Sequence, residues 1–388
     1  MGTLLIRNCR LLELADFNAV DVHVENGVIV RIGRGSGGHE PGGRIDDTLD
    51  ARGRILAPGF VDVHVQGAGG ADVLDGTGNA IETISRTCAR FGVTSFLATT
   101  VYMSGGENGH LPEAAGYTGR KTGGARLEGI HLEGPFISHE KRGMISPGCV
   151  CAPDGEVLDK ILDLLNGTLR MMTIAPEVAG SLPLIRRLTD AGIIGSIGHT
   201  NGSYEETLRG FDAGISHATH LFNAMSPIHH RVPGPLIAVL LSESITAQII
   251  SDGVHMHPEI VRLARRMLGS DRVVLITDGM QAMGLPDGSY TYNGTPYRSE
   301  NGTARYEDGT LIGTTLGMNS IVSRYRNFTG CSLNEALAAA SANPARLLGL
   351  GERGRVEPGM DADLIIIDEA INIYATIVAG NVVYGPID

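Results

Sequence analysis

The feature that most constrains the fold of this chain is a series of eight short apolar runs between about residues 57 and 350. Each run has the length of a strand, and most of the segments between the runs are long enough for a helix. A single run is also compatible with a buried helix, but eight in alternation predict a (β/α)8 TIM-type barrel. The expected strands are 59–65, 95–100, 127–133, 171–176, 192–199, 214–222, 245–252 and 272–278.

The two ends of the chain have a different pattern. Residues 1–56 alternate apolar and polar positions, as in DVHVENGVIVRIG, with an Asn-Gly turn between the runs. The alternation returns from about Gly354, in ADLIIID and ATIVAGNVVYG. We therefore expect one small β-sandwich domain formed by residues 1–56 plus 354–388, with the barrel, residues 57–353, inserted into it.

Composition excludes several classes of protein. The chain of 388 residues carries a net charge of −12, which argues against a nucleic-acid partner because such proteins need a basic face. No apolar run is long enough to span a membrane, and the first residues lack the layout of a signal peptide. The 5 scattered cysteines form no disulfide framework and fit a reducing compartment. We expect a cytoplasmic protein without a nucleic-acid or membrane partner.

Residues suited to metal binding and proton transfer stand at the ends of six of the expected strands or just after them: His64, Glu133, His199, His220, His255 and Asp278. In barrels of this type the functional residues lie at the carboxyl ends of the strands. One such residue alone is equally well explained as a capping group with satisfied hydrogen bonds, but six together favour a catalytic metal site.

The expected ligands are Glu133, His199 and His220, because a catalytic divalent ion takes about three protein ligands and keeps an open position. Asp278 is the expected group that carries protons between a water molecule and the leaving group. Nitrogen and oxygen ligands suit zinc, iron, manganese and cobalt, so the ligand types leave the metal open.

Several motifs carry a resemblance to a known family, in order along nearly the whole chain. They are PGFVDVHVQG, HLEGPF, GHT, HATHLFNAM, SDGVHMH, ITDGMQAMGLPDG and the terminal NPARLLGL with GRVEPGMDADLIIID. The chain thereby resembles the N-acetylglucosamine-6-phosphate deacetylases of the amidohydrolase superfamily. The resemblance implies hydrolysis of the N-acetyl group of N-acetyl-D-glucosamine 6-phosphate, which yields acetate and D-glucosamine 6-phosphate.

The resemblance also assigns roles to individual residues. Glu133, His199 and His220 match the metal ligands, and Asp278 matches the catalytic acid–base. His255 matches a substrate-contacting His, and the substrate-binding set is completed by Asn223, Ala224 and Arg231. Asn223 and Ala224 match residues whose amides meet the phosphate, while Arg231 matches an Arg that reaches the phosphate from the neighbouring subunit of a homodimer. The implied cofactor is one divalent ion, with zinc as the first expectation.

Two positions depart from the family pattern. Relatives often carry His-x-His on the first strand, which supports a second ion, whereas this chain has His64-Val65-Gln66. His64 could hold a second ion with a bridging Glu133, or it could be a supporting or substrate-contacting group. Relatives also often have a His where this chain has Ile145. An Ile cannot donate a hydrogen bond to a sugar, so the identity of the substrate stays open.

Three alternatives remain at this point. N-acetylgalactosamine 6-phosphate, or another N-acyl amino sugar, is a rival substrate because the galacto epimer differs only at the C4 hydroxyl. Another cyclic amidohydrolase would usually need a carbamylated Lys on the fourth strand, and MMTIAP, residues 171–176, has none. A barrel without catalysis is disfavoured because a scaffold has no need of the Glu133, His199, His220 and Asp278 set.

Overall fold

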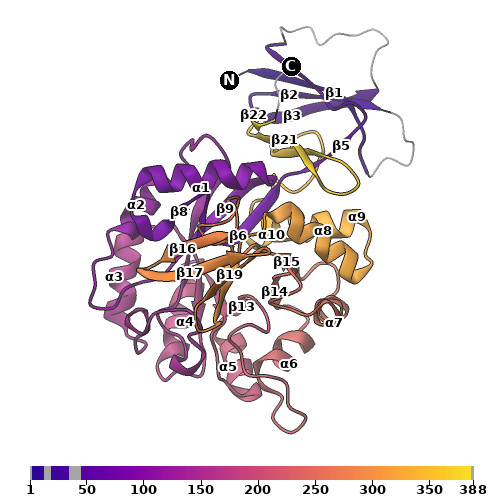
Figure 1. Cartoon of the computed structure of the whole chain (residues 1–388). Helices are drawn as coiled ribbons and strands as arrows, with labels where there is room; N and C mark the ends of the chain where they lie inside the picture. Colours follow the sequence, from indigo (N-terminus) through magenta and orange to yellow (C-terminus); the bar gives the residue numbers. More distant parts are fainter. Residues whose placement is uncertain (1, 13–18, 35–44, 386–388) are drawn as a thin grey trace.

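Eight parallel strands form one curved sheet, and their order in the sheet follows the chain, from β6 through β9 to β15 (Figure 1). The structure is a computed structural model that describes residues 2–12, 19–34 and 45–385. The strands are Phe60–Val65 (β6), Val93–Thr100 (β9), Arg126–Glu133 (β10), Leu169–Ile174 (β11), Ile194–Ile197 (β12), Ile215–Ala218 (β13), Thr246–Ile249 (β14) and Val273–Leu275 (β15). The predicted (β/α)8 barrel is confirmed.

Amphipathic helices cover the outer face of this sheet (Figure 1). In one of them Leu158, Ile161 and Leu165 recur every three or four residues and are buried against the strands. The helices are Gly78–Arg90 (α1), His110–Tyr117 (α2), Gly155–Leu165 (α3), Ser181–Asp190 (α4), Tyr204–Ala213 (α5), Gly234–Leu241 (α6), Pro258–Leu268 (α7), Met318–Thr329 (α8), Leu333–Ala338 (α9) and Ala342–Leu347 (α10).

The barrel closes between its first strand and its last. At the carboxyl ends of these strands the backbone N–H of Asp278 donates to the carbonyl of His64 at 3.0 Å, and Gln66 N–H donates to Gly279 at 2.9 Å. Nearer the amino ends the two strands stand further apart, and both donate hydrogen bonds to the carbonyls of residues 339–340, which follow α9. The direct closure therefore runs through residues that the sequence analysis singled out for chemistry.

The last four barrel strands end earlier than the sequence analysis predicted. The expected ranges reached residues 199, 222, 252 and 278, so His199, His220 and Asp278 lie beyond their strands rather than within them. The prediction fails because the backbone φ angles of these residues are +49°, +26° and +49°. An extended ladder needs negative φ, so the chain leaves the sheet before each of these side chains.

A β-sandwich formed by both ends of the chain packs beside the amino ends of the barrel strands (Figure 1). Its two sheets enclose a separate apolar core that includes Ile6, Val22, Leu364 and Ile366. One sheet contains Thr3–Cys9 (β1), Val20–Glu25 (β2), Val28–Arg34 (β3) and Asp47–Asp50 (β4); the other contains Ile55–Pro58 (β5), Leu364–Ile367 (β20), Ile373–Val378 (β21) and Asn381–Tyr384 (β22). The domain limits expected at residues 56 and 354 stay a prediction.

A partly buried ion-pair network joins the sandwich to the barrel. The Arg353 guanidinium lies 3.1 Å from Asp361 and 3.2 Å from Asp363, and it also pairs with Glu128 of β10. Arg126, at the start of β10, pairs with Asp363, whose side chain is only 2% exposed. Because each buried charge has a partner of opposite sign, the network fixes the base of the barrel on the sandwich.

Two further antiparallel sheets, which the sequence analysis did not predict, lie near the carboxyl ends of the barrel strands. The larger follows β15 in the chain and contains Gly288–Tyr292 (β16), Thr295–Glu300 (β17), Thr303–Tyr306 (β18) and Leu311–Thr314 (β19). The smaller pairs Gly67–Ala68 (β7) with Ala71–Asp72 (β8) directly after β6. Among the described residues, no helix combines the length and apolar character that crossing a membrane would require.

Candidate metal and acid–base site

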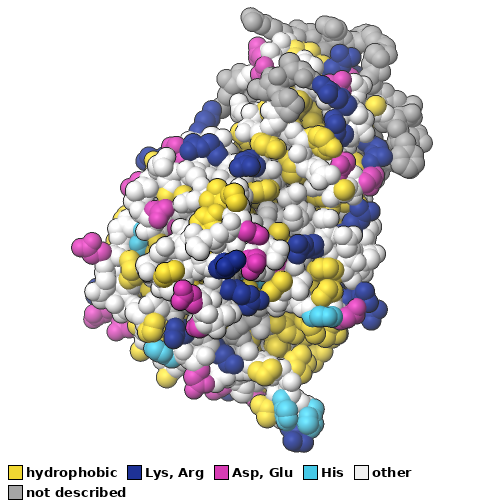
Figure 2. All heavy atoms as spheres, in the orientation of Figure 1, with side chains coloured by type: hydrophobic (Ala, Val, Ile, Leu, Met, Phe, Trp, Pro, Cys, Tyr) yellow, Lys and Arg dark blue, Asp and Glu magenta, His cyan; other side chains and the backbone are white. Residues whose placement is uncertain are grey.

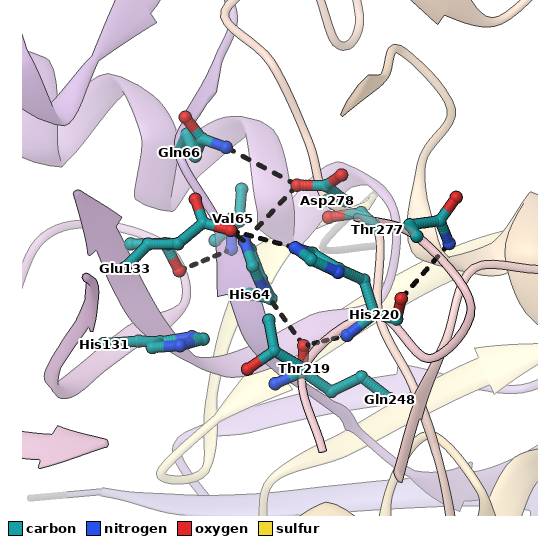
Figure 3. Close-up of polar contacts among 12 residues, drawn as sticks. His64, Val65, Gln66, His131, Glu133, Thr219, His220, Gln248, Thr277 and Asp278 are labelled. Carbon is teal, nitrogen blue, oxygen red and sulfur yellow. Dashed lines mark hydrogen bonds and ion pairs between the residues drawn. The ribbon is translucent and has the colours of Figure 1, made fainter. Parts of the chain in front are cut away.

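Side chains from five of the eight barrel strands, or from the turns after them, meet at the carboxyl end of the barrel (Figure 3). Glu133 is the last residue of β10, and it faces His199 and His220 from the turns after β12 and β13. His64, on β6, and Asp278, from the turn after β15, lie beside this group. All five side chains are at most 10% exposed, so they interact in an environment of low dielectric constant.

Three of these residues have the spacing of a metal-ligand set. Glu133 Oε1 lies 3.0 Å from the Nε2 atoms of both His199 and His220, and the two nitrogens are 3.1 Å apart. Ligand atoms around a tetrahedral zinc ion, each about 2.1 Å from the metal, are separated by about 3.4 Å. Glu133, His199 and His220 are also the group within the described residues whose ligand atoms lie close enough to share an ion.

The hydrogen bonds behind His199 leave its Nε2 free to act as a ligand. His199 Nδ1 lies 2.7 Å from the backbone carbonyl of Lys141, and a carbonyl can only accept, so Nδ1 carries the proton. In the neutral ring Nε2 is then a lone pair aimed at Glu133 and His220. A backbone carbonyl that orients a ligand His in this way is common in metal sites. The described residues therefore fit a divalent ion.

Glu133 and the neighbouring His rings each favour the charged form of the other. Burial alone would raise the pKa of Glu133, but the imidazoles of His64, His199 and His220 outweigh it and hold that pKa well below its usual range. Burial alone would lower the pKa of His220, but the hydrogen bond and charge of Glu133 outweigh it and raise that pKa. The Glu133 carboxyl group is therefore ionised at neutral pH, as a metal ligand would need to be.

Asp278 presents a carboxylate to the cavity beside the ligand set. One oxygen, Oδ1, lies 3.3 Å from His64 Nε2 and 3.5 Å from Gln66 Nε2. The other oxygen, Oδ2, lies 3.9 Å from His255 Nε2, beyond hydrogen-bond distance. The carboxylate is thus held on one side and open on the other, which suits a group that takes up and releases a proton.

His64 has a defined tautomer and a free nitrogen. Its Nδ1 lies 3.0 Å from Gln248 Oε1, and that same oxygen accepts the backbone N–H of His220 at 3.1 Å. The second bond rules out the flipped amide, so Nδ1 must carry the proton. The buried Nε2 has no hydrogen-bond partner within the described residues and lies 3.7 Å from Glu133 Oε1.

The cavity over these residues has a volume of about 210 Å³ and two kinds of wall. The polar part of the lining contains Glu133, His199, His220, Asp278, Gln66, His255, Asn223 and Ala224. All of these except Gln66 are predicted site residues. His64, which lies behind them, brings the number gathered here to eight of the nine. Arg231 is the exception: it does not line this cavity and is exposed on the loop before α6. The roles of all nine stay predictions.

The apolar wall was not predicted as a site. Leu311 and Ile312 come from β19, and Met144 comes from the loop after β10. Ile145, the position where relatives often carry a His, is 2% exposed and packs with Val101 and other apolar residues rather than lining the cavity. The sequence analysis missed β19 because it counted only the strands of the barrel.

Comparisons with known proteins give a consistent result. Residues 55–383 match a family described as the amidohydrolase family. The chain is 38% identical to an N-acetylglucosamine-6-phosphate deacetylase of Bacillus subtilis (strain 168), over 85% of this chain and 85% of that protein. It is 34% identical to an N-acetylgalactosamine-6-phosphate deacetylase of Escherichia coli O157:H7, over 82% of this chain and 85% of that protein.

Among solved structures, the chain is similar to a mutant of an N-acetyl-D-glucosamine-6-phosphate deacetylase from Mycobacterium smegmatis in complex with N-acetyl-D-glucosamine-6-phosphate. The TM-score is 0.87 at 31% sequence identity, and the match covers 99% of this chain and 100% of that chain.

We expect binding of a divalent ion to weaken as the pH falls from about 8 to about 6, because protons compete for the ligand nitrogens. The pKa of His220 is raised by Glu133, so this competition begins above the pKa of about 6.5 that is usual for His. Titration with Zn²⁺ against a chromophoric chelator at each pH measures the affinity. The Glu133→Gln variant should bind more weakly throughout and lose affinity at a lower pH. An affinity independent of pH over this range would contradict the assignment.

Proposed function

The chain belongs to the amidohydrolase family, and we propose that it is a metal-dependent deacetylase of N-acetyl-D-glucosamine 6-phosphate. It hydrolyses the N-acetyl amide to acetate and D-glucosamine 6-phosphate. The observation that carries this conclusion is the placement of Glu133, His199 and His220 in one cavity with the open carboxylate of Asp278. Similarity to deacetylases of phosphorylated amino sugars over more than four-fifths of the chain supports the substrate class.

We propose zinc as the ion, held singly by Glu133, His199 and His220. Such an ion supplies a Lewis acid that polarises an amide carbonyl and lowers the pKa of water. Glu133, His199 and His220 would hold it in a buried site where their ligand atoms already face one another. Iron, manganese and cobalt are the alternatives that the same nitrogen and oxygen ligands accept.

His64 is the residue through which a second ion would be held, with Glu133 as the shared ligand. Support comes from its buried Nε2, which lacks a hydrogen-bond partner within the described residues and lies 3.7 Å from Glu133 Oε1. Gln66 is a poor ligand compared with His, so this second site is the weaker one. The proposed reaction needs only the three-residue site.

Asp278 is the proposed acid–base. Its Oδ2 faces the cavity, where it accepts a proton from the attacking water and later donates it to the amine that leaves. The Gln66 side-chain amide donates to Oδ1 at 3.5 Å on the other side, which directs Oδ2 toward the cavity.

The substrate phosphate is proposed to bind at the turn after β13. The backbone N–H of Asn223 already donates to His220 at 2.9 Å, whereas the N–H of Ala224 donates to no group in the described residues. The free amide of Ala224 is therefore the proposed phosphate contact from within the chain. The Asn223 side chain donates to the carbonyls of His220 and Leu221 at 3.2 and 3.3 Å, so it is proposed to hold the turn in place for this contact. His255, on the opposite side of the cavity, is proposed to contact the sugar.

Arg231 is proposed to complete the phosphate site of a second copy of the chain in a homodimer. Residues 228–232 are exposed, and the loop that carries them forms a projection with His and basic side chains at its end (Figure 2). A guanidinium that lies outside its own cavity, on a projecting loop, is placed for contact with a neighbouring molecule. Its two-pronged geometry suits a phosphate.

The first experiment is acetate release by the Zn²⁺-loaded protein from N-acetylglucosamine 6-phosphate, from its galacto epimer and from unphosphorylated N-acetylglucosamine. We expect fast release from the gluco phosphate and slow release from the unphosphorylated sugar, because the Ala224 and Arg231 contacts would be lost. Faster release from the galacto phosphate would move the substrate to the function named for the Escherichia coli relative. No release from any of the three would reject the proposed function.

The Asp278→Asn variant should lose about a thousandfold or more in kcat while it keeps its metal, since an amide cannot accept the proton. Acetate release measures kcat, and elemental analysis measures bound metal. Retention of full activity would remove Asp278 from the mechanism. Loss of both activity and metal would instead make Asp278 a ligand.

The Arg231→Ala variant should raise KM for the phosphorylated sugar by roughly 10- to 100-fold, the loss expected for a charge-assisted hydrogen bond. Arg209→Ala, an exposed Arg on α5, is the matched control and should leave KM unchanged. Mixing Arg231→Ala with Asp278→Asn chains tests the direction of the contact. If Arg231 reaches the partner, the mixed dimer contains one intact site and recovers activity. If it acts within its own chain, mixing restores nothing.

A further inference from the structure

A buried carboxylate stands directly behind His255, on the side away from the cavity. Asp252 Oδ2 lies 2.7 Å from His255 Nδ1, and the Asp252 side chain is fully shielded from solvent. The hydrogen bond and charge of His255 outweigh the burial of this carboxyl and lower its pKa. Asp252 is therefore ionised at neutral pH and belongs to no part of the mechanism described so far.

The two oxygens of Asp252 have different partners. Oδ1 accepts the backbone N–H groups of Val254 at 2.9 Å and of His255 at 2.8 Å, which closes the turn after β14. The turn is also held from outside, because the guanidinium of Arg324 on α8 donates to the Asp252 carbonyl. Since the turn is already closed through Oδ1, the bond from Oδ2 to the imidazole is not needed to form it.

This second bond sets the chemistry of the ring. A carboxylate can only accept, so Nδ1 of His255 must carry a proton. Nε2 is then the atom that faces the cavity, 3.9 Å from Asp278 Oδ2, at the end of the site where the proton is transferred. In the neutral ring Nε2 is a lone pair, so it can accept a hydrogen bond from a sugar hydroxyl on the cavity side.

We propose that Asp252 is a positioning residue for the reaction: it fixes the tautomer and direction of His255 so that Nε2 meets the substrate next to Asp278. This inference rests on the proposed function, in which His255 contacts the sugar. The His255 side chain is only 5% exposed, so water has little access to its ring. The bond to Asp252 would hold the orientation of this ring in place of water.

The variant that separates ring control from turn support is Asp252→Asn. Its amide oxygen can still accept both backbone N–H groups, but its NH2 group donates toward Nδ1, which forces the ring proton to Nε2. Arg324→Lys is the matched control, because it loosens the same turn from outside and leaves the carboxylate in place.

The experiment records ¹⁵N spectra of the His rings in the zinc-loaded protein, with His255→Gln to assign the signal, and kcat and KM of each variant. We expect wild-type and Arg324→Lys protein to carry the His255 proton on Nδ1, and Asp252→Asn to carry it on Nε2. We also expect kcat/KM to fall about 100-fold in Asp252→Asn, mainly through kcat, and less than about threefold in Arg324→Lys.

An unchanged tautomer in Asp252→Asn, or an equal loss of kcat/KM in both variants, would overturn the inference and reduce Asp252 to a support of the turn. If wild-type protein hydrolyses neither sugar phosphate, the proposed function fails. The spectra would then still decide whether Asp252 sets the tautomer of His255, so the two failures are distinguishable.

Discussion

The site depends on the closure of a parallel barrel. Parallel strands of a closed sheet all end at the same rim, so residues far apart in the sequence converge there without any local signal. In this chain the closing hydrogen bond joins the backbones of His64 and Asp278, two residues whose side chains also meet at 3.3 Å. The backbone contact that closes the barrel therefore also places the proposed acid–base, Asp278, beside His64.

Turns of left-handed backbone after two strands place the proposed ligand side chains toward one another. His199 and His220 have φ angles of +49° and +26°, a region that non-glycine residues rarely adopt. Hydrogen bonds to neighbouring segments hold both residues in this strained conformation. The Lys141 carbonyl accepts from the His199 ring, and the Gln248 side chain accepts the backbone N–H of His220. As a result, Glu133 Oε1 and the Nε2 atoms of His199 and His220, the three proposed ligand atoms, lie about 3 Å from one another.

The rim of the cavity is built from a different part of the chain than its base. Leu311 and Ile312 belong to the sheet inserted after β15, and Met144 belongs to the loop after β10. These apolar side chains line the same cavity as the polar groups that the barrel contributes. A barrel that supplies the reaction chemistry and inserted segments that shape the cavity are a common division in this fold, because loop changes leave the closed sheet intact.

The sequence by itself determined the barrel and the sandwich formed by both chain ends, because strand length and strand spacing are local properties of the chain. It also allowed Glu133, His199, His220 and Asp278 to be proposed as site residues, because ligand chemistry is a property of the residue type. It did not determine where β12, β13 and β15 stop, because the turns at positive φ that follow them depend on partners outside the segment. It also gave no sign of Gln248 behind His64 or of Asp252 behind His255. Only the tertiary structure decided these contacts. The His64–Gln248 hydrogen bond joins side chains 184 residues apart and leaves no periodic trace in the sequence. Asp252 and His255 are three residues apart, but their side chains meet only because of the turn that follows β14.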